Sequence, residues 1–334
     1  MTDLTFFCFS GIGLYAAKLF KSVDPECTLI LVARTKENAD KAKLDVLSSV
    51  PSHSPTEDDT IITMACDHTS FQSIRQFCSE LHQMFYGEPE NSENVDGKLR
   101  GIDVMCLNAG ILVADTTAPE FTVDGIEVTF QTNHLAPFLM ANLLGDLINP
   151  CGRVVVTTSG LHEFCKLDNL VGMVDKDSGC IKDRFEMINS EPFDYKKCYA
   201  ASKLCNVIFS VELNKRLKER NAISVCFTPG LIPTSGLFRN QLNWKETMEK
   251  KEAVGMNESI EWGGCVLAWV CLSNEAGKTG GCFWRAPYGI SNRGGRFERD
   301  LFRSKLCEEA ANTEYHETLW SLSCRLVGVS DNLI

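Results

Sequence analysis

Short apolar runs alternate along the chain with longer stretches in which apolar residues recur every three or four positions. The apolar runs are mostly continuous, which is typical of strands covered on both faces of a parallel sheet. The alternation predicts an α/β fold: a doubly wound, Rossmann-type, mostly parallel sheet with helices on both faces, in a single domain over residues 1–334. The predicted strands are Leu4–Phe9, Thr28–Ala33, Thr60–Asp67, Ile102–Leu107, Arg153–Ser159, Ile223–Phe227 and Gly281–Arg285. The predicted helices are Gly13–Lys21, Lys36–Ser48, Phe71–Phe85, Val123–Leu147, Tyr199–Glu219, Ile260–Cys271 and Leu306–Ser323.

Three long segments interrupt this alternation. Residues 87–98 are acidic and polar and predict a solvated loop. Residues 163–196 and 235–262 each follow the carboxyl end of a predicted strand, which is where ligands bind in open α/β sheets. Loops of this length in a compact domain are usually functional or disordered. We therefore expect residues 235–262 to form a lid on the substrate side of the domain.

Composition and charge narrow the classes of protein. The chain has 334 residues, of which 44% are hydrophobic and 23% charged, as in an ordinary globular protein. The longest apolar run, Cys265–Leu272, is too short to span a bilayer. A net charge of -11 leaves no basic footprint for nucleic acid. We expect the chain as given to be cytoplasmic, or plastidic if a presequence precedes it.

The sixteen cysteines predict no special chemistry. They are scattered, no two have C-x-x-C spacing, and only six histidines accompany them, so no metal site is predicted. We expect reduced cysteines that serve as small core residues.

The first predicted strand is followed directly by Ser10, Gly11, Ile12 and Gly13, which open the first helix. Glycines at such a turn let the backbone approach a pyrophosphate, whose charge the helix N-terminus favours. This segment is therefore predicted to bind a dinucleotide, although a plain tight turn has the same residues.

Arg34 and Lys36 follow the second predicted strand. NAD-binding folds usually have an acidic residue near this point, whereas an Arg accommodates the 2′-phosphate of NADP. Arg34, supported by Lys36, therefore predicts NADPH as the cofactor. The alternative is a solvated cation at a helix start.

Polar residues also end the next strands. Asp67 ends the third predicted strand, and a carboxylate there can accept a hydrogen bond from an exposed ring amine. Asn108, Ala109 and Gly110 follow the fourth strand, where they form a natural break.

Ser159 ends the fifth predicted strand, and Tyr199 and Lys203 lie further on in a helix that we expect to be amphipathic. Residues four apart share one face of a helix. A neighbouring ammonium lowers the pKa of a tyrosine, which can then exchange a proton with a carbonyl or hydroxyl. This order of residues predicts acid–base chemistry on a substrate oxygen.

Together these motifs resemble those of the short-chain dehydrogenase/reductase family. Gly11 and Gly13 match the end of the family's glycine-rich turn, and Asn108–Gly110 match its N-A-G. The resemblance implies a catalytic tetrad of Asn133, Ser159, Tyr199 and Lys203, with Tyr199 as proton donor and Lys203 also on the cofactor ribose. It further implies that the cofactor's nicotinamide half is held by Pro229, Gly230, Ile232 and Thr234.

A narrower resemblance is to the light-dependent protochlorophyllide reductases. It lies in Lys197–Asn206, in Pro229–Arg239, and in two C-terminal stretches, Leu306–Ala310 and Trp320–Gly328. Two residues depart from that branch. Leu231 replaces a cysteine implicated in pigment reduction, and Phe7 replaces the first glycine of the cofactor turn.

Three functions are compatible with these residues. The first is an NADPH-dependent reductase, resembling protochlorophyllide reductase, that acts on a large apolar unsaturated or carbonyl substrate. The second is a carbonyl or alcohol oxidoreductase for a retinoid, sterol or other lipid-like molecule, and the third is a degenerate, non-catalytic NADP-binding module. The partner expected is a small apolar molecule, and a homo-oligomer is left open. The predicted substrate-side residues are Leu231, Leu237 and Phe238, with Leu242, Trp244 and Met248 as further candidates for the pocket wall.

Overall fold

The strands of the computed structural model form a mostly parallel sheet system. The structure describes residues 11–49, 60–87, 101–167, 193–238, 242, 244–253, 255–285 and 301–331. Within these ranges β1 pairs with β2 in parallel, and a five-stranded sheet has the order β3-β4-β5-β6-β7, in which only β7 is antiparallel. The strands are β1 (Leu29–Ala33), β2 (Ile61–Ala65), β3 (Ile102–Leu107), β4 (Ile148–Thr157), β5 (Ile223–Phe227), β6 (Phe283–Arg285) and β7 (Phe302–Ser304).

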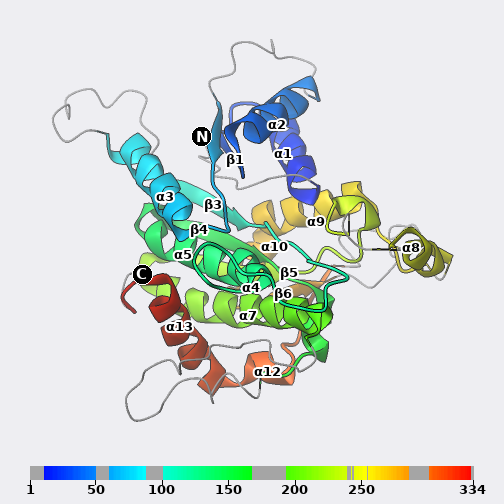
Figure 1. The fold of residues 1–334 in the computed structure, drawn as a ribbon. Helices are drawn as coiled ribbons and strands as arrows, with labels where there is room; N and C mark the ends of the chain where they lie inside the picture. The colour runs from blue at the N-terminus through cyan, green and yellow to red at the C-terminus, as the bar shows by residue number, and fades with distance from the viewer. Residues whose placement is uncertain are drawn as a thin grey trace.

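Helices cover both faces of these strands (Figure 1). Helices α1, α2 and α9 lie on one side, and α3, α5 and α7 lie on the other. The helices are α1 (Ile12–Val23), α2 (Lys36–Ser48), α3 (Phe71–Tyr86), α4 (Val128–Phe130), α5 (Ala136–Leu143), α7 (Tyr195–Arg216), α8 (Trp244–Ala253), α9 (Ile260–Leu272), α10 (Asn274–Gly277), α12 (Glu308–Ala311) and α13 (Thr313–Val327).

Successive strand residues enter two different hydrophobic cores. In β3, Val104 and Cys106 pack with α1 and α9, whereas Met105 and Leu107 pack with α5 and α7. The same division applies to β1, all five of whose residues are buried. Burial on both faces explains the continuous apolar runs, and it confirms the predicted doubly wound α/β domain.

Most predicted elements within the described ranges are present. The strand predicted at Leu4–Phe9 lies outside the described residues, as do most of the acidic loop and of the segment 163–196. The predicted helix Val123–Leu147 is wrong as a single element, because a π-helical turn at Gln131–Leu135 separates α4 from α5. The predicted C-terminal helix is likewise divided, since the Asn312 side chain caps the start of α13.

Helix α7 is not amphipathic, contrary to expectation. It begins at Tyr195, where the Asp194 carboxylate accepts from the amides of Lys196 and Lys197. Most of its residues are buried, because the sheet covers one side and α12 and α13 pack on the other. Helix α7 is therefore buried on nearly all sides, whereas an amphipathic helix is buried along one face only.

The cysteines match their predicted role where the structure describes them. They are free, and most are buried, including Cys226 on β5. Over the same described ranges no helix is long and apolar enough to cross a membrane, and no group of acidic, histidine or cysteine side chains is placed to hold a metal ion.

Candidate active site

A large cavity opens where the carboxyl ends of the parallel strands meet, and its volume is about 1710 Å³. Ligand pockets usually have a volume of roughly 300–1,000 Å³, so this space is large enough for two molecules side by side. Most of the predicted site residues line it: Ile12, Arg34, Asp67, Asn108, Ala109, Gly110, Ser159, Tyr199, Lys203, Pro229, Gly230, Leu231, Ile232, Leu237 and Phe238.

The predicted cofactor turn borders this cavity through the start of α1. Gly11 caps the helix with a φ of 62°, a conformation that favours glycine. A Cβ at Gly11 would lie 2.9 Å from the carbonyl oxygen of Ser235, so only glycine fits between the two segments. Gly13 is buried within α1, whereas Ser10 and Phe7 lie outside the described residues.

Arg34 lines the cavity at the end of β1, but Lys36 does not accompany it. Lys36 instead forms an ion pair with Asp40 and a hydrogen bond to Thr63, so the prediction that it supports Arg34 is wrong. Asn38 and Lys41, three residues apart on α2, line the cavity in its place. This pair could have been predicted from the sequence, because residues three apart in a helix that begins after Thr35 lie on the same face.

The next two strand ends are ordered by local hydrogen bonds. Asp67 accepts from the amide and the hydroxyl of Thr69, at 2.9 and 2.8 Å. Asn108 accepts from the Thr157 hydroxyl at 2.9 Å, which ties the ends of β3 and β4 together. Both side chains border the cavity, so each is fixed before a ligand arrives.

Asn133 lies behind the cavity wall, in the π-helical turn. Its Oδ1 accepts from the Ile111 amide at 2.7 Å, and its Nδ2 donates to the Ile111 carbonyl and the Ser202 hydroxyl, each at 3.0 Å. π-Bulges are frequent at functional sites. Here the turn directs a buried amide at the segment that follows Gly110.

Lys203 is buried and its ammonium meets three elements at once. Its Nζ donates to the Thr157 carbonyl at 3.3 Å and lies 5.7 Å from the centre of the Tyr199 ring. A Cβ at Gly110 would lie 3.0 Å from this Nζ and 3.2 Å from Asn133 Oδ1, so the glycine leaves room for both. Burial lowers the pKa of Lys203 to about 8, and the side chain is still mainly an ammonium at neutral pH.

The pKa of Tyr199 moves in the opposite direction from the one expected. Burial raises it to about 12, and a hydrogen bond with the Ser159 side chain opposes the increase. Desolvation disfavours the phenolate more than its neighbours stabilise it. Tyr199 therefore keeps its proton at neutral pH, as a proton donor must.

The loop after β5 also lines the cavity. The Leu231 carbonyl accepts from the Glu258 amide at 2.7 Å, and Leu231 borders the cavity. Thr234 is exposed and does not line the cavity, so its contact with the cofactor stays a prediction. Met248 lines it, but Leu242 is 73% exposed and does not.

Two apolar residues at the cavity rim were not predicted from the sequence. Leu161 and Phe164 line the cavity and are 47% and 82% exposed. They lie in a short 3-10 helix, Gly160–Phe164, directly after Ser159. No periodic pattern marks so short an element, and proximity to Ser159 was the one available signal.

The sequence of the chain is similar to those of known proteins. A family model for short chain dehydrogenases matches residues 8–164. The chain is 28% identical to protochlorophyllide reductase, chloroplastic, of Daucus carota, over 96% of this chain and 76% of that protein. It is 26% identical to the WW domain-containing oxidoreductase of Homo sapiens, over 95% of this chain and 66% of that protein.

Solved structures share the fold. The short-chain dehydrogenase/reductase of Serratia marcescens superposes with a TM-score of 0.59 at 17% identity, over 87% of this chain and 98% of that one. A short chain dehydrogenase of Burkholderia cenocepacia in complex with NADP gives a TM-score of 0.58 at 16% identity, with the same coverage. The family model and these relatives support a place for the chain in the short-chain dehydrogenase/reductase family, whose members are NAD(P)-dependent oxidoreductases of small molecules. Within it, the protochlorophyllide reductases are among its most similar relatives.

Proposed function

We propose that the protein is an NADPH-dependent reductase of a large apolar molecule that carries a carbonyl group or a ring C=C bond. The observation that carries this proposal is a cavity of about 1710 Å³ that is lined both by Arg34 and by Ser159, Tyr199 and Lys203. Apolar side chains also line this cavity, namely Leu231, Leu237, Phe238 and the rim residues Leu161 and Phe164.

The cavity suits a dinucleotide phosphate. The start of α1 lines the cavity at Ile12, where a helix N-terminus favours a pyrophosphate, and Arg34 and Lys41 bring two cations to the end of β1. Lys203 supplies an ammonium for a ribose hydroxyl beside Gly110. When bound, NADPH supplies the hydride.

The protein's own residues supply the proton and the orientation. Tyr199 holds a proton at neutral pH and donates it to the substrate, and Lys203 stabilises the phenolate that remains. Ser159 donates a hydrogen bond that fixes the substrate oxygen. Asn133 holds the loop after Gly110 in place and is the residue we assign to a proton-relay water. In the lid proposed at 235–262, Met248 closes the apolar side and excludes water.

Leu231 favours a second candidate for the substrate. It occupies the position of the cysteine in the protochlorophyllide reductase motif, and leucine has no thiol to contribute. A retinoid, sterol or other lipid-like carbonyl compound, reduced without light, fits the same dry wall.

Cofactor preference tests the role of Arg34. We expect NADPH to bind at least about tenfold more tightly than NADH, because a charge-assisted contact to phosphate contributes roughly 1.5–3 kcal/mol. Arg34→Asp reverses the preference, as measured by fluorescence titration. Lys36→Ala is the matched control and leaves it unchanged, since Asp40 already pairs with that ammonium. Equal affinities of the unmodified protein for both cofactors would exclude NADPH specificity.

Proton transfer tests the role of Tyr199. Tyr199→Phe keeps the ring and removes the hydroxyl, so we expect kcat to fall by about 10²-fold or more while NADPH affinity changes little. Tyr86→Phe, the same change on the exposed surface of α3, should have no effect. An unchanged kcat in Tyr199→Phe would mean that another group donates the proton.

A substrate panel tests the function itself. The protein is incubated with NADPH and protochlorophyllide, in light and in darkness, and separately with apolar aldehydes and ketosteroids. We expect dark reduction of an apolar carbonyl compound, poor light-driven reduction of the pigment, and an increase of the latter in Leu231→Cys. Efficient light-driven turnover by the unmodified protein would identify the pigment as substrate, and no turnover at all would favour a non-catalytic module.

A further inference from the structure

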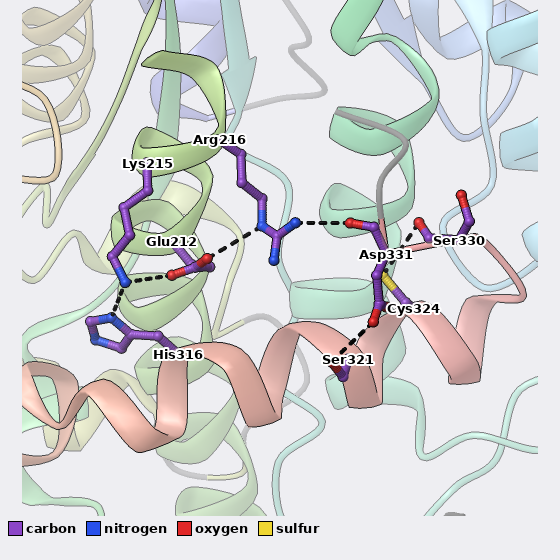
Figure 2. A network of polar contacts seen from close by, with 8 residues as sticks. All are labelled: Glu212, Lys215, Arg216, His316, Ser321, Cys324, Ser330 and Asp331. Carbon is purple, nitrogen blue, oxygen red and sulfur yellow. Dashed lines mark hydrogen bonds and ion pairs between the residues drawn. The ribbon is translucent and has the colours of Figure 1, made fainter. Parts of the chain in front are cut away.

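The C-terminal helix α13 is clamped onto α7 by a network of charged groups (Figure 2). Glu212 on α7 is buried, and its carboxylate accepts from Lys215 at 2.6 Å and pairs with Arg216 at 3.3 Å. Lys215 also donates to Nδ1 of His316 on α13 at 3.1 Å, and Arg216 donates to the Asp331 carbonyl at 2.8 Å. These contacts fix the rotation of α13 against α7.

The clamp directs two residues of α13 inward. Trp320 is buried beneath the Arg216 guanidinium, which lies 4.0 Å from the indole centre. Ser323, one turn further, is completely buried. Trp320 and Ser323 both lie in the C-terminal stretch Trp320–Gly328, and neither has a role in the reaction proposed above.

Ser323 meets a buried histidine of the π-helical turn. Its Oγ lies 2.9 Å from His134 Nε2, and His134 Nδ1 lies 3.4 Å from Asn206 Oδ1. Burial lowers the pKa of His134 to about 3, so the ring is neutral and carries one N–H. Since the Asn206 oxygen can only accept, that hydrogen is on Nδ1, and Nε2 accepts from the Ser323 hydroxyl.

Asn206 connects His134 to the active site through hydrogen bonds. Its Nδ2 donates to the Thr157 carbonyl at 3.4 Å, and the same oxygen accepts from Lys203 Nζ at 3.3 Å. Hydrogen bonds thus run in one direction from α13 to the carbonyl that holds the ammonium. Each of the three side chains is at least 99% buried, so water does not compete for these bonds.

We propose that Ser323, His134 and Asn206 are positioning residues that fix the Thr157 carbonyl and share its oxygen with Lys203, which makes α13 part of the active-site support. The proposal rests on the proposed role of Lys203 in cofactor binding and proton transfer. It explains why a serine, rather than an apolar residue, lies on the inner face of α13, because an apolar side chain there would leave Nε2 of a buried imidazole without a donor.

Breaking this relay should change the acidity of Lys203. Without the Asn206 amide, the Thr157 oxygen serves Lys203 alone, and water enters the space left by the amide. Both changes favour the ammonium, so the pKa of Lys203 rises from about 8 towards its ordinary value. The other groups that face Lys203 are Tyr199, which stays neutral over most of this range, and the uncharged Asn133.

The test measures this acidity directly. Lys203 lines the cavity, so acetic anhydride can reach it, and mass spectrometry of its peptide gives the extent of labelling as a function of pH. We expect the labelling midpoint to rise by about 0.5 pH unit or more in Asn206→Ala, and by a smaller amount in Ser323→Ala. The affinity for NADPH, measured well below the melting temperature, should fall about threefold or more in Asn206→Ala.

Ser321→Ala is the matched control, because Ser321 lies on the same helix but donates to Asp331 at the surface (Figure 2). It should leave the labelling midpoint and the NADPH affinity unchanged. If Asn206→Ala does not fold, Ser323→Ala alone decides. A midpoint in Ser323→Ala and Asn206→Ala equal to that of the unmodified protein would overturn the relay, and α13 would then be a packing element only. Because labelling needs neither cofactor nor substrate, this result stands apart from any failure of the proposed reductase activity.

Discussion

The site depends on one electrostatic arrangement, the buried ammonium of Lys203 held on the Thr157 carbonyl. An ammonium without a carboxylate partner is costly in a protein interior, and its lowered pKa reports that cost. Several features of the chain accommodate this ammonium. The end of β4 presents the carbonyl, the missing side chain of Gly110 leaves space, and α7 brings Lys203 and Tyr199 to the same point. The cavity floor is therefore arranged before any ligand binds.

The same helix explains the architecture of the C-terminal part. Because α7 is buried nearly all round, it needs cover on the side away from the sheet, and α13 provides that cover through Trp320 and the Glu212–Arg216 pair. A buried carboxylate is tolerated there because two cations neutralise it. Packing and the proposed chemistry thus meet in one helix, whose outer face stabilises the domain and whose inner face carries the residues that we propose for proton transfer.

The sequence was sufficient to predict the fold and most of the residues that line the cavity. Continuous apolar runs identified the two-sided strands, and residues at strand ends, such as Asn108 and Ser159, were predicted at the cavity because parallel strands bring their carboxyl ends together. The sequence could not predict that Lys36 would pair with Asp40, since an exposed cation has several possible partners and only the structure shows which one it contacts. Nor could it predict the pKa of Tyr199, which depends on the depth of burial, or the π-helical turn around Asn133, which interrupts an otherwise regular helical pattern.

Lys203 is a buried cation retained at a cost to stability. Its pKa of about 8 in the folded protein lies below the ordinary lysine value of 10.5, so the unfolded chain binds more protons between these pH values and stability rises with pH across them. The most direct measurement is the free energy of unfolding of the unmodified protein and of Lys203→Met, from pH 7 to pH 10.5. We expect the variant to be more stable at pH 7 by up to about 3 kcal/mol, and we expect the difference to shrink steadily towards pH 10.5. A difference that is independent of pH would show that Lys203 titrates as it does in the unfolded chain, and would contradict the account.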